Sequence, residues 1–492
     1  MRRRHWMRRS APIWRRWVMG SKWPLIKLGD FVQIVTGHPF KSKDYSEVDG
    51  VKLLRGDNIA QGTLNWQNVK MLPDDKIGSK ERNYYLRTGD VILAMDRPWI
   101  EAGLKTAQIN ENDLPCLLVQ RVACLRCEDS SDQDFIRYII SSYSFVQYVK
   151  LIQTGTAVPH ISGKQIKNFE FRLPPKNVRK VIGEVIKRLD DKAHINRQIN
   201  QTLEQMAQAL FKSWFVDFDP VVDNALDAGF FAEHSDLPEA LLRRAEQRKI
   251  VRGQPDFTPL PAETRQLFPA AFEACEEPSL GLGGWVPQGW SGRSVSKAIT
   301  VNPKVKLAKG EMAAFVDMKS LPVTGYSIED VDRKAFSGGA KFKQHDVLFA
   351  RITPCLQNGK TGFVDFLSDD ESGFGSTEFI VLRGNEFVDC TYVACLSRDE
   401  KFRQHAMQSM VGSSGRQRVQ NSCFDDYFIV IPPQNIMNKF AGIVSTSFKK
   451  LKTNSDEIIS LANVRDTLLP KLISGELRLS DDGTLADGDT DC

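Results

Sequence analysis

The chain has 492 residues, of which 41% are hydrophobic and 26% are charged, an ordinary composition for a globular protein. No apolar run approaches the roughly 18 residues that a membrane-spanning helix needs, which argues against a membrane partner. The formal net charge of +5 includes the seven Arg of the first twenty positions, so the remainder carries −2 and can contact nucleic acid only through local basic patches.

Residues 1–21 are predicted to be a disordered basic extension. Arg interrupts this stretch throughout, so it lacks the continuous apolar core of a secretion signal. Its mixture of Arg and Trp leaves open a second interpretation, an arm that contacts nucleic acid. Met19 is a candidate natural start.

Residues 22–175 are predicted to form a first mixed unit, because short apolar runs alternate there with Gly, Asp and Asn turns. One helix is predicted within it, from Asp134 to Leu151. Apolar residues then recur mostly at three- and four-residue steps, beginning with Ile182 and Val185. This spacing is typical of a coiled coil and predicts a long helix over residues 176–219.

The same order then repeats. Residues 220–284 form a connector rich in Pro and ending in Gly, residues 285–433 a second mixed unit, and residues 434–479 a second long helix broken near Pro470. Residues 480–492 are rich in Asp and Gly and are predicted to be disordered.

The repeat is visible in the sequence itself. A strand-like block ends in Pro-Pro before each long helix, at Pro174-Pro175 and at Pro432-Pro433. The predicted fold class is α+β: two similar mixed α/β units separated by two long antiparallel coiled-coil helices, with a pseudo-two-fold axis. An antiparallel pair lets each helix cover the apolar seam of the other and places one unit at each end, where the connector easily reaches the second unit.

No catalytic or metal motif is found. The Gly-rich phosphate and dinucleotide fingerprints are absent, as are His-Glu-x-x-His and Gly-x-Ser-x-Gly. The nine Cys are scattered and odd in number, which favours reduced Cys in a cytoplasmic protein over disulfides. Cys124 and Cys127 have the spacing of a zinc knuckle, but no second pair matches them, so no metal and no cofactor are predicted.

The order of several short motifs resembles the DNA-specificity subunit of type I restriction-modification systems. The resemblance covers roughly residues 22–480. Its carriers are Trp23-Pro24 through Leu28-Gly29-Asp30, Leu54-Arg55-Gly56-Asp57-Asn58-Ile59, Gly89-Asp90-Val91-Ile92-Leu93, Gly155-Thr156 to Leu173-Pro174-Pro175, Ala209 to Val221, and Leu267-Phe268-Pro269 to Pro287-Gln288-Gly289-Trp290.

This resemblance implies a subunit without catalytic activity. The two mixed units would be target-recognition domains, each reading one half of a bipartite site in double-stranded DNA. The partners would be methyltransferase subunits, expected to be two, and restriction helicase-nuclease subunits. The basic extension and the rather long connector depart from the family pattern.

Two small, polar, Gly-rich loops are the main candidates for DNA contact, since such loops approach a phosphate or a base edge closely. The candidate residues of the first unit are Thr154, Gly155, Thr156, His160, Ser162 and Lys164, with Arg97 as a second-rank candidate. Those of the second unit are Ser413, Ser414, Arg416, Gln417, Arg418 and Asn421, with Arg351 as a second-rank candidate. The alternative is that each loop is a structural turn that feeds the next strand.

The aromatic stripe Phe211, Trp214, Phe215 and Phe218 ends the first long helix and is wider than one partner helix can cover. We expect it to help dock the methyltransferase subunits; burial within this chain is the alternative. Two other functional classes stay open, a coiled-coil scaffold with two protein-binding domains and an enzyme with an unfamiliar site.

Overall fold

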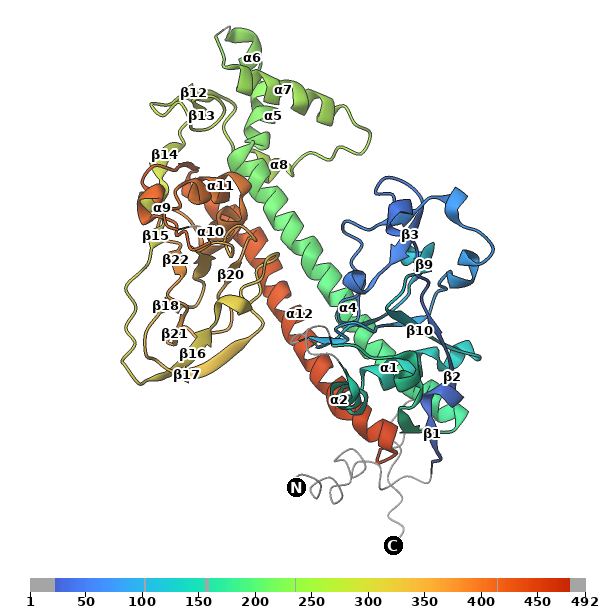
Figure 1. The fold of residues 1–492 in the computed structure, drawn as a ribbon. Helices are drawn as coiled ribbons and strands as arrows, with labels where there is room; N and C mark the ends of the chain where they lie inside the picture. Colours follow the sequence, from blue (N-terminus) through green and yellow to red (C-terminus); the bar gives the residue numbers. More distant parts are fainter. Residues whose placement is uncertain (1–22, 101–102, 155–158, 235, 414, 478–492) are drawn as a thin grey trace. The chain divides into compact units, whose positions relative to one another are not determined.

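The computed structural model describes residues 23–100, 103–154, 159–234, 236–413 and 415–477 (Figure 1). Two units are distinguished by their internal contacts: residues up to Ala193 together with those from Ile459 form unit 1, and His194–Ile458 form unit 2. The whole predicted basic extension (1–21) and the whole predicted tail (480–492) lie outside the described residues.

Unit 1 is built on an antiparallel sheet of strand order β2-β10-β5-β8. Its apolar interior comes from the short apolar runs from which the sequence predicted strands. Val91 to Ala94 in β5, for example, are fully buried. Smaller sheets, β1-β11, β4-β3-β9 and β6-β7, complete the unit. The strands are β1 (Leu25–Lys27), β2 (Val32–Thr36), β3 (Val51–Leu54), β4 (Met71–Leu72), β5 (Val91–Ala94), β6 (Trp99–Ile100), β7 (Gly103–Leu104), β8 (Thr106–Gln108), β9 (Cys116–Leu118), β10 (Val122–Cys127) and β11 (Glu170–Arg172).

The helix predicted from Asp134 to Leu151 is in fact two helices, α1 (Gln133–Ser141) and α2 (Tyr143–Ile152). Ser142 separates them in an extended conformation, and its hydroxyl accepts a hydrogen bond from the backbone N–H of Phe145 at 3.3 Å. A serine at this position satisfies an otherwise free N–H at the start of a helix, so it favours a new start over continuation. A short helix, α3 (Gly163–Lys167), follows.

Unit 2 repeats this arrangement with additions. Its antiparallel sheet β15-β22-β19-β20 corresponds to the main sheet of unit 1. A second, mixed sheet has the strand order β17-β16-β21-β18, and its strands are interspersed along the chain with those of the first. The strands are β12 (Phe272–Ala274), β13 (Trp285–Pro287), β14 (Ser291–Ser294), β15 (Thr300–Val301), β16 (Met312–Val316), β17 (Val331–Ala335), β18 (Ala340–Lys343), β19 (Val347–Ala350), β20 (Thr361–Phe363), β21 (Ser372–Gly375), β22 (Phe379–Arg383) and β23 (Phe428–Ile431). The helices among them are α9 (Val295–Ala298), α10 (Cys390–Arg398) and α11 (Glu400–Gln408).

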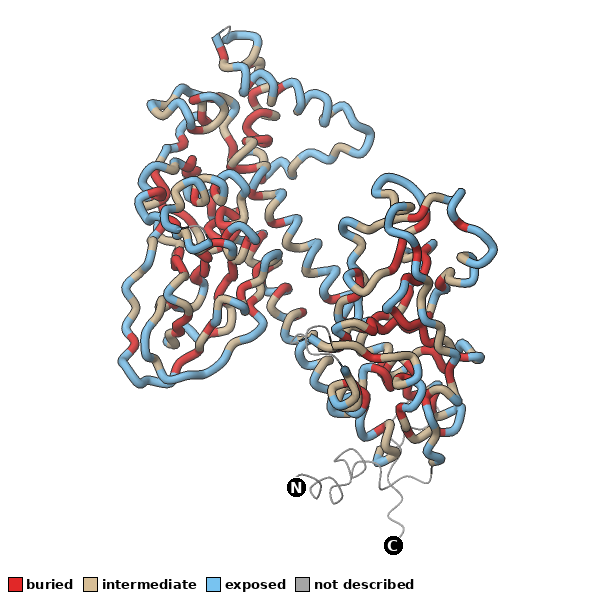
Figure 2. Tube along the Cα trace, viewed as in Figure 1, coloured by how far each residue is buried: buried red, intermediate tan, exposed pale blue. Residues whose placement is uncertain are grey.

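A buried ion pair is repeated at the same place in both main sheets. Asp90 receives two hydrogen bonds from Arg126 in unit 1, and Asp346 receives two from Arg383 in unit 2. Each Asp also accepts the backbone N–H of the residue three positions earlier, at 2.8 and 2.7 Å. Figure 2 shows buried residues in the interior of each unit, in helices as well as in strands.

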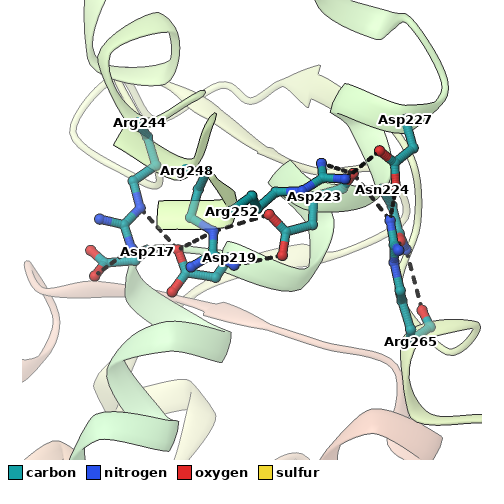
Figure 3. Close-up of polar contacts among 9 residues, drawn as sticks. All are labelled: Asp217, Asp219, Asp223, Asn224, Asp227, Arg244, Arg248, Arg252 and Arg265. Carbon is teal, nitrogen blue, oxygen red and sulfur yellow. Dashed lines mark hydrogen bonds and ion pairs between the residues drawn. The ribbon is translucent and has the colours of Figure 1, made fainter. Parts of the chain in front are cut away.

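The connector contains helices α5 (Asp219–Asp227), α6 (Phe230–Glu233), α7 (Glu239–Arg252) and α8 (Ala262–Arg265). Acidic side chains at four-residue steps on α5 face Arg side chains at the same spacing on α7, and Arg265 follows at the end of the row (Figure 3). Arg248, for example, donates to Asp223 at 3.0 and 2.6 Å.

The long helices are α4 (Lys176–Phe211) and α12 (Gln434–Ser474), and α4 continues into a π-helical turn (Lys212–Val216). In unit 2, Asn196 contacts Glu457 while Asn200 contacts Leu451, so the segments run antiparallel. In unit 1, Asp190 accepts a hydrogen bond from Arg465. The predicted α+β class, with two mixed units and two long antiparallel helices, is confirmed.

The expected break near Pro470 is wrong, because α12 continues through this residue to Ser474. A proline inside a helix removes one backbone hydrogen bond. Here Leu469 and Leu472 are buried in the core of unit 1, and this packing holds the last turns in place. None of the helices in the described part of the chain has the length and apolarity needed to cross a bilayer.

Candidate nucleic-acid interface

The predicted loop of unit 1 is a tight hairpin whose ends are joined through the backbone. Thr154 and His160 exchange two hydrogen bonds, of 3.0 and 2.8 Å. The hairpin is also fixed beside the end of β5, since the N–H of Arg97 donates to Pro159 and the N–H of Ile161 donates to Met95. Gly155 and Thr156 lie outside the described residues.

Three charged or polar side chains meet beside this hairpin. Asp96, at the end of β5, lies 2.6 Å from Nδ1 of His160. Arg121, in the turn between β9 and β10, lies 3.8 Å from Asp96 and 3.5 Å from Nε2 of His160. The Arg121 side chain keeps 59% of its surface exposed, and its backbone adopts the left-handed conformation with φ of 68°. Such conformations are costly for a non-Gly residue and concentrate at functional sites.

Asp96 and Arg121 of this group line a cleft in unit 1 of about 860 Å³. Basic side chains outnumber acidic ones in the lining, which suits a polyanion. The basic residues are Arg55, Lys70, Arg97, Lys105 and Arg121, and the acidic residues are Glu47, Asp57 and Asp96.

Unit 2 has the same hairpin. Val411 and Arg418 exchange backbone hydrogen bonds of 3.1 and 3.0 Å, and the N–H of Thr353 and of Val419 tie the hairpin to the end of β19. The other predicted residues here are exposed, except Gln417, which is half-buried, and Ser414, which lies outside the described residues. No side-chain partner of Arg416 is found within the described ranges.

Arg418 is held by a carboxylate. Its Nε and Nη2 atoms both donate to Glu378, at distances from 2.5 to 3.0 Å. The hydrogen bonds from Arg418 hold the pKa of Glu378 below its ordinary value, so the carboxylate is charged at neutral pH. The neighbouring Arg351 is turned inward and donates to the carbonyl of Val419 at 2.7 Å.

The remaining predicted residues divide by role. Ser162 caps α3, accepting the N–H of Gln165 at 3.3 Å, so its hydroxyl already has a structural partner. Lys164 and Asn421 are exposed. The two second-rank arginines are not at equivalent positions. By its backbone hydrogen bonds, Arg351 of unit 2 corresponds to Met95 of unit 1, and Arg97 of unit 1 corresponds to Thr353 of unit 2.

Sequence reasoning missed three residues of these sites. Asp96 was passed over beside Arg97, while Arg121 and Glu378 lie far in sequence from the hairpins that they contact. The one available signal was position, because Arg121 immediately precedes β10 and Glu378 immediately precedes β22.

The aromatic stripe is buried within unit 2, as the alternative interpretation expected. Phe211, Trp214 and Phe218 are each 1% exposed and Phe215 is 4% exposed. More than one helix covers them: α12 supplies Phe440, α10 supplies Tyr392, and the segment after α8 supplies Phe268, whose ring centre is 5.0 Å from that of Trp214. Any partner must therefore bind another surface.

Within the described ranges, no group of three or more His, Cys, Asp or Glu side chains is arranged to hold a metal ion. Cys124 and Cys127 lie in β10, and burial raises the pKa of both thiols, that of Cys127 to about 12. Both are therefore protonated at neutral pH and are poor metal ligands as they stand.

Comparison with known proteins shows which sequences this chain resembles. Residues 20–205 match the family described as Type I restriction modification DNA specificity domain. The Type I restriction enzyme HindI specificity subunit of Haemophilus influenzae is 26% identical over 477 residues, which cover 93% of this chain and all of that protein. The EcoAI specificity subunit of Escherichia coli is 36% identical over 193 residues, 38% of this chain and 32% of that protein.

Among solved structures, the S subunit of a type I restriction-modification system from M. genitalium aligns over 92% of this chain and 97% of its own, with 13% identity and a TM-score of 0.47. Residues 20–205 thus carry the DNA specificity domain of this family, and the chain as a whole is similar to type I restriction-modification specificity subunits.

Proposed function

We propose that this chain recognises a bipartite sequence in double-stranded DNA, one half with each unit. The observation that carries the proposal is the repeated hairpin, which ends at His160 in unit 1 and at Arg418 in unit 2 and is tied in each case to the end of a central sheet strand. Two copies of one reading device suit a target with two halves.

The exposed and half-buried side chains around the hairpins have the chemistry that DNA requires. Arg pairs with the O6 and N7 atoms of guanine, Gln and Asn pair with adenine, and Lys favours phosphate. Arg97 and Lys164 supply such donors in unit 1, and Arg416, Gln417 and Asn421 supply them in unit 2. The basic cleft of unit 1 adds attraction for the phosphate backbone.

The proposed role requires neither catalysis nor a bound cofactor in this chain. Methylation and cleavage belong to methyltransferase subunits, expected to be two, and to restriction helicase-nuclease subunits that assemble with it. The methyltransferase would dock on an exposed apolar face of α4 formed by Ile195, Ile199 and Met206, which are 49%, 37% and 60% exposed. Helical spacing places these three side chains on one side of the helix.

The test is methylation-site profiling of the assembled complex carrying Arg97→Ala or Arg416→Ala. We expect each variant to weaken or relax one half of the target and to leave the other half unchanged. Arg243→Ala, on the exposed face of α7, is the matched control and should change neither half. Methylation without a two-part motif, or equal relaxation of both halves by either variant, would contradict the proposal and would favour the scaffold alternative.

A further inference from the structure

The two hairpin sites can be superimposed position by position from their backbone hydrogen bonds. The N–H of Met95 donates to Arg121 in unit 1, and the N–H of Arg351 donates to Glu378 in unit 2. The turn positions Arg121 and Glu378 are therefore equivalent. His160 and Arg418 are equivalent as well, since each closes its hairpin and bridges to the strand end, at Asp96 and at Ile352.

Each site contains an arginine beside a carboxylate, but the two groups are on different elements. In unit 1 the arginine is on the turn, as Arg121, and the carboxylate follows the strand, as Asp96. In unit 2 the carboxylate is on the turn, as Glu378, and the arginine is on the hairpin, as Arg418. The charge carried by the turn is thus positive in unit 1 and negative in unit 2.

We propose that Arg121 in unit 1 and Arg418 in unit 2 are the guanine-reading residues of the two half-sites, and that Asp96 and Glu378 position them. This inference rests on the proposed function and names the residues that give it specificity. Both arginines lie beside the hairpins and remain accessible, with 59% and 48% of their side-chain surface exposed.

The geometry in unit 2 explains how a positioned arginine can read a base. Glu378 engages Nε and Nη2 of Arg418, while no contact of Nη1 is found among the described residues. A guanidinium fixed along one edge loses less conformational freedom when it binds the two acceptors of guanine. Glu378 is only 21% exposed, so it remains beside Arg418 instead of turning into solvent.

In unit 1 the positioning is shared. Asp96 lies 2.6 Å from His160, and both side chains lie within 3.8 Å of Arg121. Arg121 lies in the tight turn between β9 and β10, where its backbone adopts the left-handed conformation. His160 therefore supports the reading arginine instead of replacing it, in contrast to its equivalent Arg418.

The first test replaces each arginine with lysine in the assembled complex. Lysine keeps the positive charge, and with it a phosphate contact, but lacks the planar fork that pairs with guanine. We expect Arg121→Lys and Arg418→Lys each to reduce discrimination about 5- to 150-fold at one base pair, in different halves of the target. Unchanged profiles with both lysine variants would overturn the inference.

The second test separates positioning from simple stabilisation. Glu378→Gln should relax the same base pair as Arg418→Lys, whereas Glu371→Gln, which removes a half-buried carboxylate paired with Arg333 in the same unit at 2.8 Å, should not. Combining Glu378→Arg with Arg418→Glu restores an ion pair in reversed order. A wild-type profile in this double variant would show that the pair is only structural and would refute the inference.

The outcome also distinguishes this inference from the proposed function. Relaxation of separate halves by Arg97→Ala and Arg416→Ala, without any effect of Arg121→Lys and Arg418→Lys, would overturn the inference alone. A target without two separable halves would contradict the proposed function itself.

Discussion

Burial raises the pKa of Asp365, which follows β20, to about 6. Lys452 attracts the carboxylate, but it is also hydrogen-bonded to Asp456, whose negative charge opposes the ionisation of Asp365. Because the pKa is higher in the folded chain than its ordinary 3.8, the folded state binds the proton more tightly. The favourable contribution is full below about pH 4 and is lost as the pH rises through about 6.

We therefore expect Asp365→Asn to stabilise unit 2 at pH 7.5, by up to about 2 kcal/mol, because the amide carries no charge to bury. The midpoint of thermal unfolding, measured between pH 4 and 8, should rise most at the upper end of this range. Asp369→Asn, a change of the same type at an exposed site of the same loop, is the control. A lower midpoint for Asp365→Asn at pH 7.5 would contradict the stated cause.

At the level of single residues, the sequence predicted the hairpin segments but not the residues from distant segments that contact them. Gly, Ser and Arg marked the segment that ends at Arg418, because loop chemistry is local. Glu378 lies 40 positions away, and only the pairing of β22 with β19 brings it to Arg418. A pattern in one segment of the chain cannot show such a contact.

The elements differ in how far local sequence determines them. Three- and four-residue periodicity predicted both long helices, since an apolar seam is a property of the segment itself. The break at Ser142 was missed because the apolar pattern continues across it, while one hydroxyl decides where the second helix begins. The residues that cover the aromatic stripe could not be named from its own segment, because they include Phe268 of the connector together with residues of α10 and α12.

The pairing of α5 with α7 depends on the row of ion pairs in Figure 3. Arg248 and Asp223 are only 13% and 14% exposed, so Asp223→Asn leaves a largely buried guanidinium with only the more distant carboxylate of Asp219, at 3.7 Å. The expected cost lies between the ~1 kcal/mol of an exposed pair and the ~3–5 kcal/mol of a fully buried one. Hydrogen exchange of the backbone amides of α7 should become faster.

Glu239→Gln is the matched control for this prediction. It removes a carboxylate from the same helix pair, but Glu239 and its partner Arg243 are 83% and 67% exposed. The rate of hydrogen exchange of the α7 backbone amides should therefore stay the same as in the unsubstituted protein. Equal effects of the two substitutions would mean that burial does not set the strength of these pairs.

At the scale of the whole chain, duplication is the property that the sequence reveals most directly. The repeated Pro-Pro blocks indicated two units, and the buried pairs of Asp90 with Arg126 and of Asp346 with Arg383 occupy the same sheet positions in both. The two hairpin sites nevertheless differ in chemistry. This combination suits a molecule that keeps one scaffold and varies the reading residues in each copy.

Assembly provides the last prediction, and it contrasts an exposed apolar residue with a buried one. Met206 is 60% exposed on α4, so Met206→Glu places a charge on the proposed docking face and should reduce co-purification of the methyltransferase with little change in thermal stability. Trp214→Ala should do the reverse. It opens a cavity in the core of unit 2 and should cost about 3–5 kcal/mol of folding free energy, while the fraction that remains folded still binds the methyltransferase. Full assembly with Met206→Glu, measured at equal amounts of folded chain, would exclude this face of α4 as the docking surface.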